Sequence, residues 1–133
     1  MKLNKRHSVA GMLLAIALFS GCSQREKPKP PDYHGSLGVT DTTRIVGWAW
    51  DKNRPDAPVS VDIYDGNTLL TTVTADQFRK DLVDAGIGNG KHGFVLETPA
   101  ALKDNQRHEV TAKIASNEFT LANSPRVIAP KSP

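Results

Sequence analysis

Residues 59–75 read VSVDIYDGNTLLTTVTA, and this stretch decides the fold. Residues 59–63 alternate apolar and polar side chains, which is the pattern of a strand with one buried face. Asp65-Gly66-Asn67 is a turn sequence of the kind that closes β-hairpins. Residues 68–75 are rich in β-branched side chains and are predicted to return as the next strand. The stretch therefore predicts an antiparallel hairpin.

A period of two recurs on both sides of this hairpin. We expect further strands at 37–40, 44–50, 93–98, 108–115, 118–121 and 126–128. In the strand 108–115, Val110, Ala112 and Ile114 alternate with polar residues and define its buried face. Several short strands with frequent turn signals predict an all-β fold, an antiparallel β-sandwich spanning residues 35–128.

One segment departs from this period. Residues 76–85 read DQFRKDLVDA, and Phe78, Leu82 and Ala85 fall at helical spacing. Asp76 is the expected N-cap, because a side-chain carboxylate there can accept hydrogen bonds from the free N–H groups of the first helical turn. The sequence therefore predicts one short helical insertion between strands.

The N-terminal segment has the features of a secretory signal. A short positive start precedes an apolar run of 11 residues from Val9 to Phe19. A transmembrane helix needs about 20 apolar residues, so residues 1–21 are predicted to be a signal peptide rather than a membrane span. Phe19-Ser20-Gly21-Cys22 resembles the lipobox of bacterial lipoproteins, in which the Cys thiol receives a diacylglyceryl group and the signal is cleaved just before it.

This resemblance implies attachment to a membrane through lipid on Cys22. Ser23 stands where Asp signals inner-membrane retention in enterobacterial lipoproteins, so the resemblance favours the outer membrane, with the domain facing the periplasm. Residues 22–34 comprise the lipidated Cys and a Pro-rich linker, which we expect to be an extended spacer. Residues 129–133 are expected to form a disordered tail.

Charge and composition exclude several classes of function. Three of the 17 Lys and Arg residues lie in the predicted signal peptide, leaving 14 basic and 14 acidic residues for the rest. A neutral remainder does not indicate a nucleic-acid partner. The single Cys excludes a disulfide framework, and the His residues lack metal-binding spacing. Asp51, Asn53 and Asp56 lack the Gly and Glu of a calcium loop, so we interpret them as a polar turn. We expect a non-enzymatic protein without metal or cofactor.

The body of the chain carries a longer motif run. It reads Gly47-Trp48-Ala49-x-Asp51, Val61-x-Ile63, Asp65-Gly66, Ala75-x-x-Phe78-Arg79-x-Asp81-Leu82 and Gly86-Ile87-Gly88-x-Gly90-x-His92-Gly93-Phe94. This run resembles an immunoglobulin-like accessory domain of bacterial surface and secreted proteins, often joined there to carbohydrate-active modules. The resemblance implies an immunoglobulin-like sandwich, and it identifies a type of domain rather than a function.

Three side chains are the candidates for contact with a partner. Trp48 and Trp50 share one face of a strand, and we expect Trp48 in the core and Trp50 at the strand end. Trp50 and Tyr64 are the binding candidates, because aromatic rings stack on sugars and anchor protein interfaces. His92 is expected to hydrogen-bond the glycine loop of residues 86–90, with a ligand contact as the alternative.

These observations leave two classes of function open. The first is a membrane-anchored envelope lipoprotein whose sandwich mediates protein–protein interaction or assembly. An assembly role predicts an exposed sheet edge or an apolar patch. The alternative is a carbohydrate-binding module for an envelope or extracellular glycan. It predicts that Trp50 or Tyr64 is exposed beside polar side chains in a shallow groove.

Overall fold

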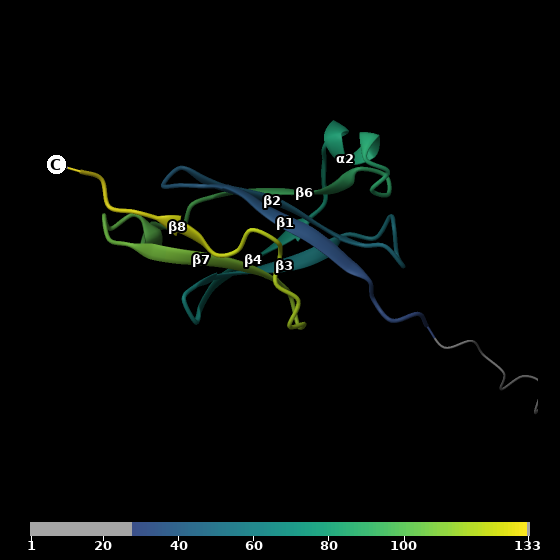
Figure 1. Ribbon diagram of the computed structural model, residues 1–133, viewed down its shortest axis with the longest axis horizontal. Helices are drawn as coiled ribbons and strands as arrows, with labels where there is room; N and C mark the ends of the chain where they lie inside the picture. The colour runs from purple at the N-terminus through teal and green to yellow at the C-terminus, as the bar shows by residue number, and fades with distance from the viewer. Residues whose placement is uncertain (1–27, 133) are drawn as a thin grey trace, which may run out of the picture.

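The computed structural model describes residues 28–132. The predicted signal peptide and Cys22 lie outside the described residues. The described chain folds into two packed β-sheets, with one small helix, α2, projecting at one end (Figure 1). No helix within residues 28–132 is both long and apolar enough to cross a bilayer.

Two four-stranded antiparallel sheets form the sandwich. Sheet A has the order β1-β2-β6-β5, and sheet B has the order β4-β3-β7-β8. Sheet A consists of β1 (Tyr33–Thr40), β2 (Arg44–Asp51), β6 (Lys91–Glu97) and β5 (Gln77–Phe78). Sheet B consists of β4 (Thr68–Ala75), β3 (Val59–Asp65), β7 (His108–Ile114) and β8 (Arg126–Ile128). The remaining elements are α2 (Lys80–Asp84) and the short 3-10 helix η2 (Ala100–Leu102).

The order of the strands confirms the predicted fold class. Sheet A corresponds to the A-B-E-D sheet of an immunoglobulin domain, and sheet B to the C-F-G sheet with one added strand beside C. The hairpin predicted from residues 59–75 is β3 and β4, paired from Val59↔Ala75 to Asp65↔Thr68. The chain is therefore an all-β, immunoglobulin-like antiparallel sandwich.

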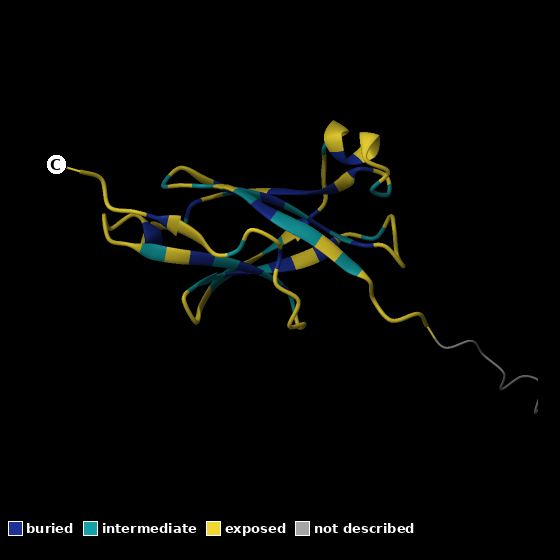
Figure 2. Cartoon of the chain, viewed as in Figure 1, coloured by how far each residue is buried: buried dark blue, intermediate teal, exposed yellow. Residues whose placement is uncertain are grey.

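The core lies between the sheets, where buried and exposed residues alternate along the strands (Figure 2). Val110, Ala112 and Ile114 are buried, as the alternation of residues 108–115 predicts. From sheet A, Phe94 reaches into the core above Gly47, and a Cβ at Gly47 would lie 2.5 Å from the Phe94 ring. Burying one such aliphatic or aromatic side chain contributes roughly 1.5–3 kcal/mol. Gly47 is therefore required for Phe94 to fill the core.

Some boundaries differ from those predicted. β1 begins at Tyr33, inside the predicted linker, because residues 33–37 pair with β2. Residues 118–121 form no strand and make only a single bridge, Lys113↔Thr120. Residues 129–132 carry no regular structure and are exposed, although the backbone N–H of Lys131 donates to Asn105 Oδ1.

The helical insertion is present but shorter than predicted. The helix covers only Lys80–Asp84, and Asp76 does not cap it, because the N-cap position is Arg79. Phe78 is not part of a helical face: it lies in β5 and is 60% exposed. The physical reason is that β5 pairs with β6, and the Arg79 N–H donates to the Gly90 carbonyl, so tertiary hydrogen bonds replace the first helical turn.

Candidate binding surface

The outer face of sheet A carries both tryptophans. On β2, Ile45, Gly47 and Ala49 point into the core, which turns Trp48 and Trp50 outward, where both are half-buried. The prediction that Trp48 lies in the core is therefore wrong. The inward position next to Trp48 is Gly47, and it has no side chain because the Phe94 ring and the Ser36 carbonyl occupy the space above it. A large ring fits only on the opposite face.

The register of the sheet gives the tryptophans their neighbours. On β1, His34 pairs with Trp50 and Ser36 with Trp48. On β6, Gly93 pairs with Trp48. Directly paired residues of antiparallel strands share a face. These positions therefore form one outward surface on the first three strands of sheet A.

Arg79 completes this surface. Its aliphatic stem covers Gly93, since a Cβ there would lie 2.6 Å from Arg79 Cδ. Asp81 holds the guanidinium with two hydrogen bonds, Nε to Oδ1 at 3.0 Å and Nη2 to Oδ2 at 2.7 Å. This arrangement lowers the pKa of Asp81, chiefly through the side-chain hydrogen bond from Arg79. We call His34, Trp48, Trp50 and Arg79 the Trp–Arg surface.

The ring of Trp50 is fixed in place by the β2–β3 loop. Its Nε1 donates to the carbonyl of Pro55 at 3.0 Å. The His34 ring lies 5.8 Å away and the His92 ring 6.3 Å away, both tilted relative to the indole. Centroid distances of this size are typical of favourable aromatic contacts. Trp50 is thus presented in one orientation rather than as a free side chain.

His92 supports this arrangement from inside. It is fully buried, and its Nε2 lies 2.7 Å from the same Pro55 carbonyl. Because a carbonyl only accepts, Nε2 carries the proton, and the buried Nδ1 has no partner among the described residues. His92 bonds Pro55 rather than the glycine loop itself, although Pro55 packs directly against Gly88. With no exposed surface, His92 is a support for Trp50 and not a residue that a ligand can reach.

Tyr64 lies on the other side of the molecule. It points outward from β3 in sheet B, and Lys113 Nζ lies 5.4 Å from the centre of its ring. An ammonium group at this distance makes a cation–π contact. Since Trp50 and Tyr64 lie on opposite outer faces, they cannot form a single site. Two of the hollows in residues 28–132, of about 340 and 280 Å³, are lined by neither Trp50 nor Tyr64.

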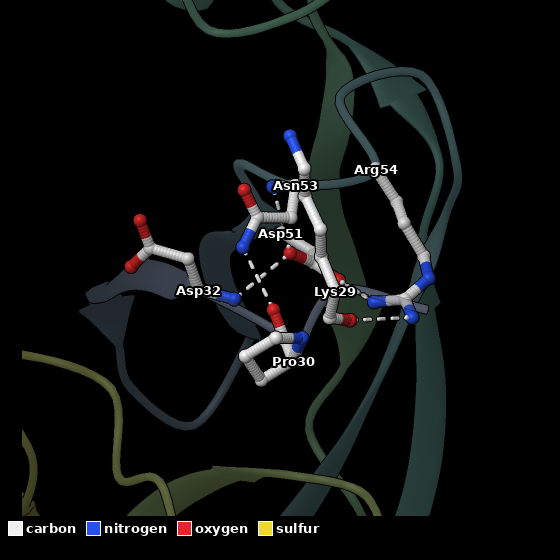
Figure 3. Close-up of polar contacts among 6 residues, drawn as sticks. All are labelled: Lys29, Pro30, Asp32, Asp51, Asn53 and Arg54. Carbon is white, nitrogen blue, oxygen red and sulfur yellow. Dashed lines mark hydrogen bonds and ion pairs between the residues drawn. The ribbon is translucent and has the colours of Figure 1, made fainter. Parts of the chain in front are cut away.

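A polar site that the sequence did not reveal lies at the end of β2, around Asp51 (Figure 3). The buried Asp51, at the end of β2, accepts three hydrogen bonds. Its Oδ1 accepts from the backbone N–H groups of Asp32 at 3.0 Å and Asn53 at 2.9 Å. Its Oδ2 accepts from Arg54 Nη1 at 2.8 Å. The polar turn interpreted from Asp51, Asn53 and Asp56 is thus organised by the carboxylate of Asp51.

The same turn also forms hydrogen bonds with the segment that precedes β1. Arg54 Nη2 donates to the carbonyl of Lys29 at 3.1 Å, and Asn53 Nδ2 donates to that of Pro30 at 2.7 Å. The Lys52 N–H donates to the carbonyl of Asp32 at 2.8 Å. We call these contacts of residues 29–32 with residues 51–54 the clasp. No sequence signal marks it, because its acceptors on the linker are backbone carbonyls, which every residue has.

The charge of Asp51 is stabilised by the clasp. Burial acts to raise the pKa of this carboxyl, but the hydrogen bonds from Asp32, Arg54 and Asn53 outweigh burial. The net effect holds the pKa of Asp51 below its ordinary value. Asp51 is therefore ionised at neutral pH and binds the linker most strongly in that form.

A charged cluster lies in sheet B where β3 ends and β7 begins. His108, at the start of β7, places Nε2 2.7 Å from Asp104 and Nδ1 2.8 Å from Asp65. The hydrogen bond with Asp104 and that with Asp65 raise the pKa of His108 above its ordinary value, although burial opposes them. We call this trio the His108 clamp. Within residues 28–132, no cluster of His, Cys, Asp and Glu side chains has the form of a metal site.

Comparison with known proteins adds little to this geometry. Neither a protein-family model nor a curated protein matches the chain. Among solved structures, the chain is similar to an engineered protein at 15% sequence identity and a TM-score of 0.36. That match covers 78% of this chain but only 20% of the engineered protein, so the chain spans about a fifth of its length. The assignment of the fold therefore stands on the strand order of this chain.

Proposed function

We propose that this protein is a non-enzymatic, membrane-anchored lipoprotein of the cell envelope whose sandwich binds a protein partner. The partner contacts the Trp–Arg surface of sheet A. The observation that carries the proposal is the pair of half-exposed tryptophans, Trp48 and Trp50, turned outward beside Arg79.

The composition of this surface favours a protein partner. Trp and Arg are enriched among the residues that dominate the binding energy of protein interfaces. Trp50 is held by Pro55 and Arg79 by Asp81, so little side-chain freedom is lost when a partner binds.

The test is affinity capture of the full chain after reversible cross-linking in intact cells. Trp48→Ala removes a half-exposed ring that makes no hydrogen bond within residues 28–132, and Tyr64→Ala on the opposite face is the matched control. We expect Trp48→Ala to reduce the captured partner at least about tenfold, the effect of losing an interface anchor worth more than about 1.4 kcal/mol. Tyr64→Ala should leave capture unchanged.

A second arm separates the two classes of partner. Cell-wall sacculi and purified polysaccharide are co-sedimented with the same full-length variants. Sedimentation that free sugar competes away, and that Trp48→Ala abolishes, would replace the protein partner with a glycan. A captured partner that both variants retain equally would contradict the proposed surface.

The anchor is tested separately through Cys22. If Cys22 carries lipid, no more than seven residues separate it from Lys29 in the clasp, and a span of that length reaches at most about 25 Å. The domain is then held close to the membrane, with the clasp nearest to it. Cys22→Ala should move the full chain from the membrane fraction to the soluble fraction, while Ser23→Ala should not.

A further inference from the structure

The outer edge of β4 has no partner within residues 28–132. β4 is the terminal strand of sheet B and makes its ladder hydrogen bonds only with β3. In an antiparallel strand, alternate residues direct their N–H and C=O groups to one side and then the other. Half of the backbone groups of β4 therefore face outward from the sheet, ready to pair with another strand.

The other edges of the sandwich are protected, and β4 is not. The edge of β1 is covered by residues 121–123, because the Leu37 N–H donates to Ala122 and the Ala122 N–H donates to Gly35. β5 has two residues and β8 has three. β4 has eight residues, TLLTTVTA, with no charge, Pro or Gly. Its one irregularity in pairing with β3 lies near the hairpin turn, so residues 71–75 lack the charges, Pro and bulges by which natural proteins protect exposed edges from pairing.

We infer that β4 pairs with β4 of a second copy of this chain, in antiparallel orientation, and joins two copies of sheet B into one continuous sheet. An antiparallel pair of identical strands is related by a two-fold axis, the commonest symmetry of protein dimers. Such an interface needs a strand that complements itself. β4 meets this condition because it carries no charge that would face a like charge.

The register of this pairing follows from the regular part of β4. Residues 71–75 pair with β3 without interruption, whereas the irregularity lies nearer the hairpin turn. A two-fold axis through Val73 places Thr72 opposite Thr74 of the second copy, on the exposed face of the sheet. Cross-strand Thr–Thr pairs of this kind are favourable in sheets. The inference concerns a surface distinct from the Trp–Arg surface and does not rest on the proposed function.

Disulfide trapping between differently tagged full-length chains tests this register. One chain carries Thr72→Cys and the other Thr74→Cys, both on the exposed face, so neither substitution disturbs the core. In intact cells, mild oxidation should give a mixed-tag dimer at least about tenfold more abundant than the control pair Thr72→Cys with Val127→Cys, because only the paired cysteines are held at high effective concentration. Val127 is 45% exposed on the short edge strand β8.

A charge substitution gives the second readout. Thr72→Lys combined with Thr74→Lys places lysines opposite lysines across the axis. Velocity sedimentation of the detergent-solubilised full chain should then show monomer, while the wild type shows dimer. Equal trapping of the two cysteine pairs, or a wild type that is monomeric, would overturn the inference. The Tyr64 and Trp48 variants do not alter β4. Loss of partner capture can therefore occur while the dimer persists, and loss of the dimer can occur while partner capture persists.

Discussion

The outer faces of the two sheets differ in chemistry, although both cover the same core. The face of sheet A presents Trp48 and Trp50, and Arg79 covers Gly93, the residue paired with Trp48. The face of sheet B presents mainly small polar and charged side chains, such as Thr72 bonded to Asp62 at 2.6 Å. A strand face that needs only to be solvated is polar. The outward tryptophans of sheet A are therefore the basis of our proposal that this side of the sandwich meets another molecule.

The largest expected effect on stability comes from a substitution on the inward face of β2, the strand that carries both tryptophans. In Gly47→Ala, the added methyl would overlap the Phe94 ring and the Ser36 carbonyl. We expect the free energy of unfolding to fall by about 3 kcal/mol, the upper range for overpacking a core. Urea denaturation of the full chain measures it.

Gly38→Ala is the matched control in the same sheet, since its added methyl would meet only the Val46 carbonyl, at 3.2 Å. A loss of stability in Gly47→Ala no greater than in Gly38→Ala would mean that Phe94 does not dictate which side of β2 faces inward.

The clasp gives the next largest effect, beside the outer face of sheet A. Asp51→Ala leaves three donors without their acceptor. We expect the free energy of unfolding to fall by about 2–3 kcal/mol, as for the loss of charge-assisted hydrogen bonds at a buried acceptor. Limited proteolysis should then cut within residues 29–32 before the domain unfolds. Asp56→Ala, in the same loop but exposed, should leave both readouts at the wild-type level.

Trp50 and Tyr64, the half-buried aromatic residues on the outer faces of the two sheets, sharpen the contrast between them. Trp50→Phe removes the hydrogen bond to Pro55 and should cost about 1 kcal/mol of stability. Tyr64→Phe keeps the ring beneath Lys113 and removes only a hydroxyl that makes no hydrogen bond within residues 28–132, so its cost should be near zero. Thermal unfolding of both variants measures the difference. If Tyr64→Phe proves the costlier substitution, sheet A does not hold its aromatic residue more rigidly.

The smallest expected effects are changes in stability with pH, and they have opposite signs at the two sites. The pKa of Asp51 is lowered in the folded protein, so the clasp stabilises above the ordinary carboxyl pKa and weakens as the pH falls. The pKa of His108 is raised, so the His108 clamp stabilises below the ordinary histidine pKa and weakens as the pH rises through its raised value.

Stability curves of two variants separate these contributions. Asp51→Asn should flatten the acid limb and His108→Gln the neutral-to-alkaline limb, each leaving the other limb in place. A His108→Gln variant that changes only the acid limb would contradict the assignment of the two sites.

Much of the fold could be predicted from the sequence because β3 and β7 alternate between clearly apolar and clearly polar side chains. Their buried faces are unambiguous, and Val110, Ala112 and Ile114 are buried as expected. β2 is different, because both of its faces are apolar: Ile45, Gly47 and Ala49 alternate with Val46, Trp48 and Trp50. Alternation shows that the two tryptophans share a face but not which face is inside, and Trp48 was assigned to the wrong side.

The other differences arise from contacts between distant residues. The pairing of β5 with β6 replaced the first turn of the predicted helix, and local helical spacing cannot reveal that competition. The clasp joins residues 23 and 25 positions apart through the backbone carbonyls of Pro30 and Lys29. For the same reason the composition of the Pro-rich linker could not reveal that residues 29–32 bind the domain.

The central claim is that sheet A, and not sheet B, meets the protein partner. Site-specific photo-crosslinking tests it most directly, with the photoreactive residue placed in the full chain at Val95 or at Glu109. Val95 pairs with Val46 on the outer face of sheet A, and Glu109 is exposed on β7 of sheet B. We expect a heavier adduct from Val95 that Trp48→Ala abolishes, and none from Glu109. An adduct from Glu109 alone would contradict the account.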